Sequence, residues 1–233
     1  MNYLFDVDGT LTAPRQKINK QFRQEFGTWV NDQQLIGDKV YLVTGSDKKK
    51  TVQQIGVCLY RTFDGCYQNC GNKLYVKNRL VKESQWKISA DAKIRIFEII
   101  KKSLWYGIAT SNMEERTGMI NISTVGRDCT KKQRQEYSDW DEYSLERESI
   151  AKTIREEYPE LDASIGGMIS IDIYPKGKNK SQVIDDMVGE TVFFGDNCKE
   201  GGNDYEISRS ADFYYEVNND EDMRKLLRTV GKS

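Results

Sequence analysis

The sequence predicts an α/β fold: a Rossmann-like core with a parallel sheet, interrupted by an inserted α+β domain. Apolar runs at residues 3–5, 40–43 and 191–194 have the length and composition of buried strands. Helical segments alternate with these strands, and such a βαβ order is typical of a parallel sheet. The middle of the chain breaks this order, because strands and helices there do not alternate as βαβ units.

The change of pattern also predicts the domain boundaries. We expect residues 1–78 and 178–233 to form the core domain and residues 79–177 to form the α+β insert. The length of 233 residues is sufficient for two modest domains.

Composition and charge limit the classes of protein that the chain can represent. No run approaches the roughly 18–20 apolar residues of a membrane span. The sequence begins directly with a strand, so we expect no signal peptide and a cytoplasmic location. The formal net charge of −1 argues against general nucleic-acid binding. We therefore expect neither a membrane nor a nucleic acid as a partner.

Histidine is absent from the chain, which excludes catalysis by Ser-His-Asp and Cys-His groups and the usual transition-metal sites. Five cysteines, an odd number, are expected to be reduced thiols rather than a disulfide framework. Acid–base catalysis must then use carboxylates, Lys, Tyr or Cys. The remaining metal ligands are oxygen atoms, which favour a hard cation such as Mg²⁺.

The first half of the core is predicted as alternating strands and helices. Phe22, Phe26 and Val30 recur at helical spacing and predict a helix over residues 19–31. The strand at 40–43 precedes a helix from residue 48 to about 59. Short strands then follow at 63–67 and 73–76, and a third at 80–81 lies just beyond the expected core boundary; turn residues separate them.

The insert is predicted as two helical regions and three strands. Ser89 is expected to cap a helix whose apolar face comprises Ile94, Ile96, Phe97, Ile100 and Leu104. Strands are expected at 106–110 and 119–123, and helices over 130–158 with Trp140, Ile150 and Ile154 facing inward. Residues 169–174 alternate strictly, which places Ser170, Asp172 and Tyr174 on one face of a strand.

The C-terminal part returns to the βαβ order. A helix is predicted over residues 180–188, followed by the strand at 191–194 that ends in Gly195 and Asp196. A last strand at 212–216 and a helix from about 221 to 230 complete the core.

Polar side chains follow three of the predicted core strands. Asp6 and Asp8 follow the first strand, Ser46 the second and Asp196 a later one, while Lys180 begins a helix. Ligands of open α/β sheets bind beyond the carboxyl ends of the strands, so these side chains are expected to share one site. Each also has a simpler interpretation: Ser46 as a helix N-cap, Asp196 as a turn residue and Lys180 as a solvated helix residue.

This combination of side chains is suited to phosphoryl transfer, which needs a nucleophile, neutralised phosphate oxygens and a proton donor. Asp6 is the expected nucleophile and Asp8 the general acid and base. Mg²⁺ between Asp6, the Asp8 backbone carbonyl and Asp196 would reduce the repulsion between carboxylate and phosphate. Ser46 and Lys180 would hold the other phosphate oxygens.

The sequence Asp-Val-Asp-Gly-Thr at residues 6–10 resembles the nucleophile motif of the haloacid dehalogenase (HAD) superfamily of phosphotransferases. The similarity extends to a family within it, the eukaryotic-type phosphomannomutases. The matching segments run in order over nearly the whole chain, at residues 6–18, 45–47, 116–123, 126–127, 166–175, 193–196 and 201–204. The chain departs from the family pattern at residues 67–71, at residues 105–115, at Tyr205, and at residues 208–210, where relatives supply ligands for an auxiliary cation. We expect that second cation site to be weakened or absent.

The resemblance implies specific roles for residues of this chain. Asp6 would become an aspartyl-phosphate, and Asp8 would act as the acid and base. Asp204 would join Asp6, Asp8 and Asp196 as a metal ligand. The phosphosugar would bind to residues contributed largely by the insert, namely Arg15, Arg116, Arg127, Arg134, Ser170 and Asp172. The implied cofactors are Mg²⁺ and a hexose 1,6-bisphosphate activator, and the implied assembly is a homodimer formed through the insert.

Three hypotheses about function remain at this point. The first is a phosphohexose mutase that interconverts mannose 6-phosphate and mannose 1-phosphate through a hexose 1,6-bisphosphate. The second is a Mg²⁺-dependent sugar phosphatase of the HAD type on the same scaffold. The third is a binding protein without catalytic activity. Arginines on the insert favour the first, because a mutase must hold its substrate at the non-reacting end and a phosphatase needs only to release it.

Overall fold

The computed structural model of the protein describes residues 1–105 and 112–231. The chain divides into two compact units. The core unit comprises Met1–Glu83, Asn179–Glu200 and Asp204–Ser233, and the insert unit comprises Ser84–Lys178 and Gly201–Asn203. Among the described residues, no helix is both long enough and apolar enough to cross a membrane.

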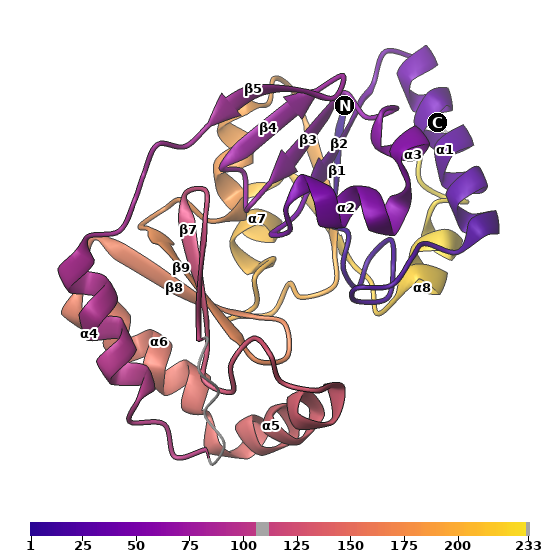
Figure 1. The fold of residues 1–233 in the computed structure, drawn as a ribbon. Coiled ribbons are helices and arrows are strands. Elements are labelled where there is room, and N and C mark those ends of the chain that lie inside the picture. The colour runs from indigo at the N-terminus through magenta and orange to yellow at the C-terminus, as the bar shows by residue number, and fades with distance from the viewer. Residues whose placement is uncertain (106–111, 232–233) are drawn as a thin grey trace. The chain divides into compact units, whose positions relative to one another are not determined.

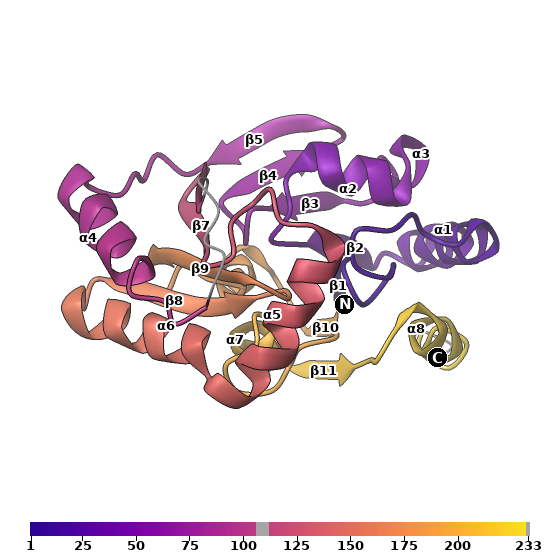
Figure 2. The same ribbon diagram turned by 60° about the horizontal axis from the view of Figure 1, so that its bottom comes forward.

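The core unit is built on a seven-stranded sheet with the strand order β11-β10-β1-β2-β3-β4-β5 (Figure 1; β10 and β11 are labelled in Figure 2). The strands are β1 (Asn2–Phe5), β2 (Lys39–Val43), β3 (Gly65–Gln68), β4 (Lys73–Val76), β5 (Arg79–Glu83), β10 (Thr191–Gly195) and β11 (Phe213–Glu216). Neighbouring strands from β11 to β3 are parallel, as predicted. The last two strands, β4 and β5, are antiparallel and extend one edge.

The core unit ends five residues beyond the boundary expected from the sequence. Strand β5 pairs with β4 from Val76↔Arg79 to Lys73↔Glu83 and therefore belongs to the core sheet. All five residues of β5 are exposed. Backbone hydrogen bonds rather than buried side chains place this strand, and for that reason hydrophobic patterning did not locate the boundary.

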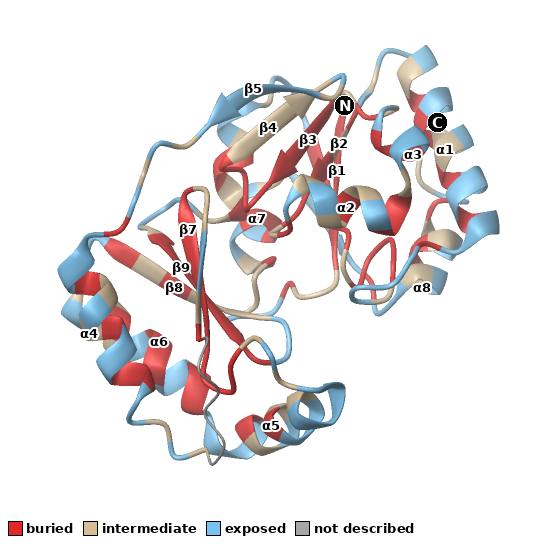
Figure 3. Cartoon of the chain, in the orientation of Figure 1, coloured by how far each residue is buried: buried red, intermediate tan, exposed pale blue. Residues whose placement is uncertain are grey.

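Helices cover both faces of the core sheet, as in a doubly wound α/β fold. One face packs against α1 (Lys20–Leu35), α2 (Lys48–Ile55), α3 (Val57–Tyr60) and α8 (Asp220–Leu226). The other face packs against the 3₁₀ helix η1 (Lys180–Asp186) and α7 (Tyr205–Ser210). Alternation along β1 places Phe5 on the first face and Leu4 on the second. Figure 3 shows the central strands as buried.

The helices of the core differ from the predicted ones at their ends. Phe22, Phe26 and Val30 are buried on α1, as expected. The single helix expected over 48–59 is wrong, because Gly56 has a φ of 83° and separates α2 from α3. The segment expected as a helix from residue 180 is a 3₁₀ helix that ends at Asp186. The short helix α7 was not predicted.

The described part of the insert unit forms a four-stranded antiparallel sheet and three helices. The strand order is β6-β7-β9-β8, with β6 (Met113–Arg116), β7 (Met119–Ser123), β8 (Leu161–Gly166) and β9 (Ser170–Pro175). Helices α4 (Ala90–Ile100) and α6 (Glu146–Glu157) lie on one face, and α5 (Lys131–Ser144) lies between β7 and α6 in the chain (Figure 2). Isoleucines of β7 and β9 form the core beneath α4 and α6. The other face of this sheet carries the polar residues.

Several predictions for the insert are confirmed. Ser89 caps α4 through its side chain, and the strands at 119–123 and 169–174 are β7 and β9. The apolar face predicted for α4 is partly wrong, because Ile94, Phe97 and Leu104 are exposed. The structure buries Ala92, Ile96, Ile99 and Ile100 of α4 instead. Strands β6 and β8 were not predicted, and the strand expected at 106–110 lies outside the described residues.

Candidate active site

The ends of three neighbouring strands of the core sheet meet, and each is followed by polar residues. Phe5 of β1 pairs with Phe194 of β10 on one side and with Leu42 of β2 on the other. The backbone N–H of Asp6 donates to the carbonyl of Phe194 over 2.9 Å, which extends the ladder by one residue. Asp6 and Asp196 therefore lie next to each other at the carboxyl edge of the sheet.

Gly9 allows the Asp6–Asp8 turn to approach Asp196 closely. Its φ is +88°, a conformation that other residues adopt rarely. A Cβ atom at this position would lie only 2.0 Å from Oδ2 of Asp196. Glycine is thus required here for two reasons, backbone conformation and space.

Three carboxylates and one ammonium group form a buried cluster at this edge, the core cluster of Asp6, Lys180, Asp196 and Asp204. Nζ of Lys180 lies 2.6 Å from Oδ1 of Asp6 and 2.6 Å from Oδ1 of Asp204. Oδ2 of Asp204 accepts from the backbone N–H of Asp196 over 3.3 Å. Lys180 is 1% exposed, which excludes the solvated role considered from the sequence.

The charges in the core cluster are not balanced, and the pKa values reflect this. Burial raises the pKa of Asp6 well above its ordinary value, with Asp204 and Asp196 adding to the effect and Lys180 opposing it. Burial and the nearby Asp204 raise the pKa of Asp196 to about 7. Burial opposes the charge of Lys180, but Asp204 and Asp6 raise its pKa well above the ordinary value. One lysine thus faces three carboxyl groups.

This arrangement fits a divalent cation. One oxygen from each of Asp6, Asp196 and Asp204 lies within 4.8 Å of the others. Carboxylate oxygens are the preferred ligands of Mg²⁺, and a cation there would supply the missing positive charge. The Asp8 carboxylate lies outside this group among the described residues. Any contribution of Asp8 to the cation would therefore have to come from its backbone carbonyl.

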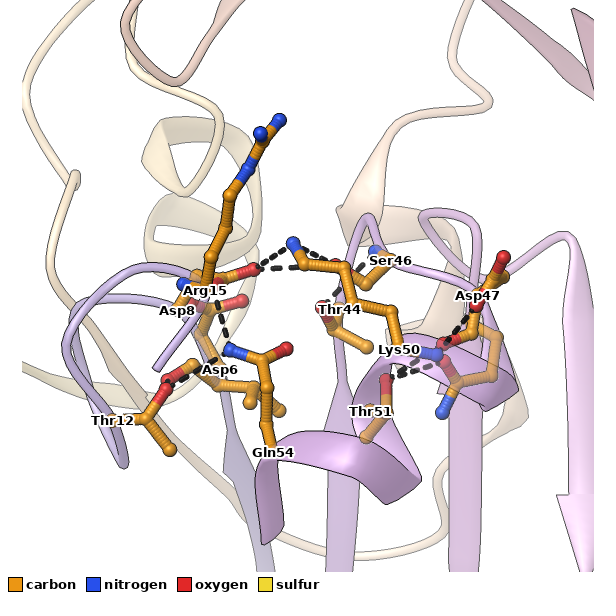
Figure 4. A network of polar contacts seen from close by, with 12 residues as sticks. Asp6, Asp8, Thr12, Arg15, Thr44, Ser46, Asp47, Lys50, Thr51 and Gln54 are labelled. Carbon is orange, nitrogen blue, oxygen red and sulfur yellow. Dashed lines mark hydrogen bonds and ion pairs between the residues drawn. The ribbon is translucent and has the colours of Figure 1, made fainter. Parts of the chain in front are cut away.

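The carboxylate of Asp8 is held by a separate set of donors (Figure 4). Oδ2 accepts from Nζ of Lys50 over 2.6 Å and from the hydroxyl of Ser46 over 3.2 Å. Oδ1 accepts from Nε2 of Gln54 and from the backbone N–H of Arg15, each over 2.8 Å. Both carboxylate oxygens are therefore fixed in direction.

Asp6 and Asp8 consequently differ in protonation behaviour although they are two residues apart. Burial disfavours the charge of Asp8, but Lys50 and the other donors outweigh it and hold the pKa of Asp8 below its ordinary value. The pKa of Asp6 is shifted in the opposite direction. Such a pair, with pKa values driven apart, can divide the roles of nucleophile and proton acceptor.

Ser46 contributes to this set through its side chain and does not cap the following helix. The N-cap of α2 is Asp47, whose carboxylate accepts from the N–H of Lys50 over 2.7 Å. The N-cap interpretation of Ser46 is therefore wrong. Its hydroxyl instead lies between Asp8 and Lys50, with a distance of 2.8 Å to Nζ of Lys50.

Arg15 reaches the site through its backbone. Its φ of +62° turns the chain so that its N–H points to Asp8. The guanidinium group extends away from Asp6 and Asp8 (Figure 4). The expected phosphosugar contact of Arg15 remains a prediction.

A second polar site lies on the sheet of the insert unit. Arg116 ends β6, Arg127 follows β7, and Arg134 lies on α5. Nη2 of Arg116 and Nη2 of Arg127 lie 2.7 Å and 2.5 Å from the same oxygen, Oε2 of Glu114. Arg134 donates to the backbone carbonyl of Arg127 over 3.2 Å. We call Arg116, Arg127 and Glu114 the arginine cluster.

The predicted residues of β9 lie beside this cluster. Asp172 pairs across the sheet with Asn121, whose amide donates to its carboxylate. The side-chain oxygen of Asn121 accepts from Nη2 of Arg127. Ser170 is buried and pairs with Ser123. The structure therefore links Asp172 to Arg127 through Asn121.

Comparison with known proteins identifies the family. A sequence model described as eukaryotic phosphomannomutase matches residues 33–233. The chain belongs to this family. A phosphomannomutase of Arabidopsis thaliana is 35% identical over 221 residues, with 89% of this chain and 86% of the relative covered. A phosphomannomutase of Nicotiana benthamiana is 34% identical over 223 residues, with 89% and 84% covered.

The fold of this phosphomannomutase-family chain is that of the HAD superfamily. The structure of a HAD subclass IIB sugar phosphatase superposes with a TM-score of 0.62 over 99% of this chain and 98% of the other. The two sequences are 16% identical, so this likeness concerns the fold alone.

Four residues that contribute to the core site or to the insert site of this phosphomannomutase-family chain were not predicted from its sequence. They are Lys50, Gln54, Glu114 and Asn121. Lys50 and Gln54 lie four residues apart on the predicted helix that follows Ser46, and this spacing was a signal that both face one side. The segment that contains Glu114 matches no motif. The contacts of Asn121 depend on cross-strand register, which the sequence does not specify directly.

The expected loss of the auxiliary cation site in this phosphomannomutase-family member remains a prediction. Arg209, on α7, lies over the rings of Tyr205 and Tyr214 at 5.4 Å and 5.1 Å. The hydroxyl of Ser208 donates to the backbone carbonyl of Tyr205. A cationic side chain in this segment is unfavourable for a second cation nearby.

Proposed function

We propose that this chain interconverts mannose 6-phosphate and mannose 1-phosphate through phosphorylated Asp6 and a hexose 1,6-bisphosphate. The observation that carries the proposal is the presence of two anion-handling sites in one chain. The core cluster with Asp8 is suited to transferring a phosphoryl group. The arginine cluster of the insert is suited to holding a second phosphate that does not react.

Asp6 is the nucleophile in this proposal, and its surroundings prepare it for a phosphoryl group. Lys180 keeps a positive charge beside its Oδ1 atom and can pair with phosphoryl oxygens. Asp196 and Asp204 would hold Mg²⁺ together with Asp6, and the cation when bound supplies charge neutralisation for the phosphate. The hydroxyl of Ser46 would donate to a further oxygen.

Asp8 moves the proton in both half-reactions. In the first, a sugar hydroxyl oxygen attacks phosphorus, the P–O bond to Asp6 breaks, and Asp8 accepts the hydroxyl proton. The low pKa of Asp8 keeps it ionised and ready for this step. In the second, the Asp6 carboxylate attacks the other phosphate of the bisphosphate. Asp8 then returns its proton to the sugar oxygen that leaves.

The arginines of the insert explain why a mutase is favoured over a phosphatase. A bisphosphate must be held at one phosphate while the other reacts, and then bound in the reverse orientation. Guanidinium groups pair with phosphate oxygens at two points, which fixes the orientation of the sugar. Arg134, Ser170 and Asp172 would contribute further contacts to the phosphosugar. Activation by a hexose 1,6-bisphosphate and a homodimer formed through the insert belong to the same proposal.

The product of the reaction tests this function. The protein is incubated with mannose 1-phosphate, Mg²⁺ and a trace of hexose 1,6-bisphosphate, and phosphorus NMR follows the products. We expect mannose 6-phosphate. Free mannose with inorganic phosphate would instead identify a sugar phosphatase, and an Asp6→Asn variant serves as the inactive control.

A further inference from the structure

A row of polar side chains crosses the insert sheet from edge to interior. Cross-strand register places Glu114 of β6 opposite Asn121 of β7, and Asn121 opposite Asp172 of β9. Directly paired residues project from the same face of a sheet. Arg127 contacts both Glu114 and Asn121, so its guanidinium group lies over this row.

Glu114 differs from the other members of the row in its exposure. It lies on the edge strand β6 and its side chain is 46% exposed, whereas Asn121 and Asp172 are buried. Its Oε2 atom contacts Arg116 and Arg127 at the same time. A carboxylate held by two arginines occupies the same donors that a phosphate would use. Since its side chain borders solvent, it can leave without breaking the core.

The charges of the arginine cluster favour this exchange. Burial and the neighbouring Arg116 lower the pKa of Arg127, while Glu114 opposes that effect. The Nε–H group of Arg127 is buried and has no hydrogen-bond partner among residues 1–105 and 112–231. Glu114 therefore neutralises the charge of Arg127 but leaves its Nε–H donor unused. A phosphate dianion brings more charge and more oxygen atoms than the carboxylate does.

We infer that Glu114 is an internal competitor for the phosphate that Arg116 and Arg127 bind, and that it promotes release of the phosphorylated sugar. When phosphate leaves, the carboxylate returns to Arg116 and Arg127 and again occupies the donors that the phosphate had used. This inference rests on the proposed function for the identity of the ligand. A mutase must release and rebind its bisphosphate, so a competing group of this kind is useful to it.

The test is a binding measurement on the full chain with Glu114→Gln. Titration calorimetry with inorganic phosphate, without divalent cation, compares the variant with the unmodified protein. Removing the competing charge should tighten phosphate binding by roughly 3- to 10-fold. Glu114→Ala should change binding in the same direction, and a thermal melt of each variant checks the fold.

Glu115→Gln is the matched control. Glu115 is the next residue on β6, has the same charge and pairs with Lys93 of α4 at 2.5 Å instead of the arginines. It should leave phosphate affinity unchanged. A double variant tests whether the effect depends on Arg127. Adding Glu114→Gln to Arg127→Gln should tighten phosphate binding less than twofold. Unchanged or weaker phosphate binding in both folded Glu114 variants would overturn the inference.

Kinetics of the mutase reaction add an independent test. Glu114→Gln should lower KM and also lower kcat, because tighter holding slows release. A merely structural role would raise KM. If the unmodified protein makes no mannose 6-phosphate but Glu114→Gln still tightens phosphate binding, the proposed function fails and the competitor role stands. If mannose 6-phosphate forms and phosphate binding is unchanged, only the competitor role fails.

Discussion

The core cluster and the arginine cluster both place opposite charges in contact, but they differ in burial. Asp6, Lys180 and Asp204 are each 2% exposed or less, so their ion pairs are shielded from bulk water. The side chains of Glu114, Arg116 and Arg127 are 46%, 23% and 15% exposed. Breaking a buried ion pair is costly, whereas a pair near solvent costs little to exchange. The first arrangement suits fixed chemistry, and the second suits binding and release.

Lys180→Met should have the largest effect, because it leaves Asp6 and Asp204 buried without a positive partner. We expect the free energy of unfolding to fall by about 3–5 kcal/mol in the absence of a divalent cation. Urea denaturation measures it, and mutase activity should be lost as well. Lys176→Met, at an exposed position four residues away, should change neither. A stable and active Lys180→Met protein would show that the core cluster does not depend on this lysine.

Lys50→Met should affect catalysis more than stability. The variant removes the closest donor to Asp8, so the pKa of Asp8 should rise and the carboxylate should lose its fixed direction. We expect kcat to fall by roughly 10- to 100-fold with little change in KM. Steady-state kinetics measure both constants. Lys49→Met, on an exposed position of the same helix, is the control, and equal losses in the two variants would argue against the role of Lys50.

Arg127→Gln should affect binding without affecting the fold. KM for the phosphosugar should rise by roughly 10-fold, while the free energy of unfolding should change by less than about 1 kcal/mol. The same kinetic and denaturation experiments serve here. A large loss of stability with unchanged KM would contradict the view that the arginine cluster serves binding and not stability.

The pH dependence of cation binding should give the smallest effect. Asp196, with its pKa near 7, holds a proton in the folded metal-free protein more tightly than in the unfolded chain. Its contribution to stability is present below the ordinary pKa of Asp and is lost as pH rises through about 7. Mg²⁺ competes with this proton, so stabilisation by Mg²⁺ should increase over the same range.

Melting temperatures with Mg²⁺ and with EDTA between about pH 5.5 and 8.5 test this linkage. Asp196→Asn should reduce the pH dependence of the difference. If the difference in melting temperature between Mg²⁺ and EDTA does not change with pH in the unmodified protein, Mg²⁺ does not compete with a proton on Asp196.

The core site was more predictable from the sequence than the insert site, for a physical reason. Asp6, Ser46 and Asp196 follow apolar strands, and parallel strands bring their carboxyl ends together regardless of detail. The proximity of Lys180 to Asp6 agrees with this expectation. Lys50 and Gln54 were identifiable in principle, because they lie four residues apart on the helix that follows Ser46.

In the insert, contacts depend on antiparallel register, and a shift of one residue would reverse the faces. The link from Asp172 through Asn121 to Arg127 could not be derived for that reason. Strand β6, with its charged residues, lacks the apolar alternation that would have predicted it. The same charged residues include Glu114, so the segment that was hardest to predict carries the proposed competitor for phosphate.

The central claim is that Asp6 passes a phosphoryl group to a sugar rather than to water. The most direct measurement uses hexose 1,6-bisphosphate with radiolabelled phosphate, followed by a chase with unlabelled mannose 1-phosphate. We expect an acid-stable, base-labile label on the peptide that contains Asp6, and transfer of that label to sugar phosphate during the chase. Asp6→Asn should take up no label. Label that appears mainly as inorganic phosphate, or that remains on the protein in Asp6→Asn, would contradict the account.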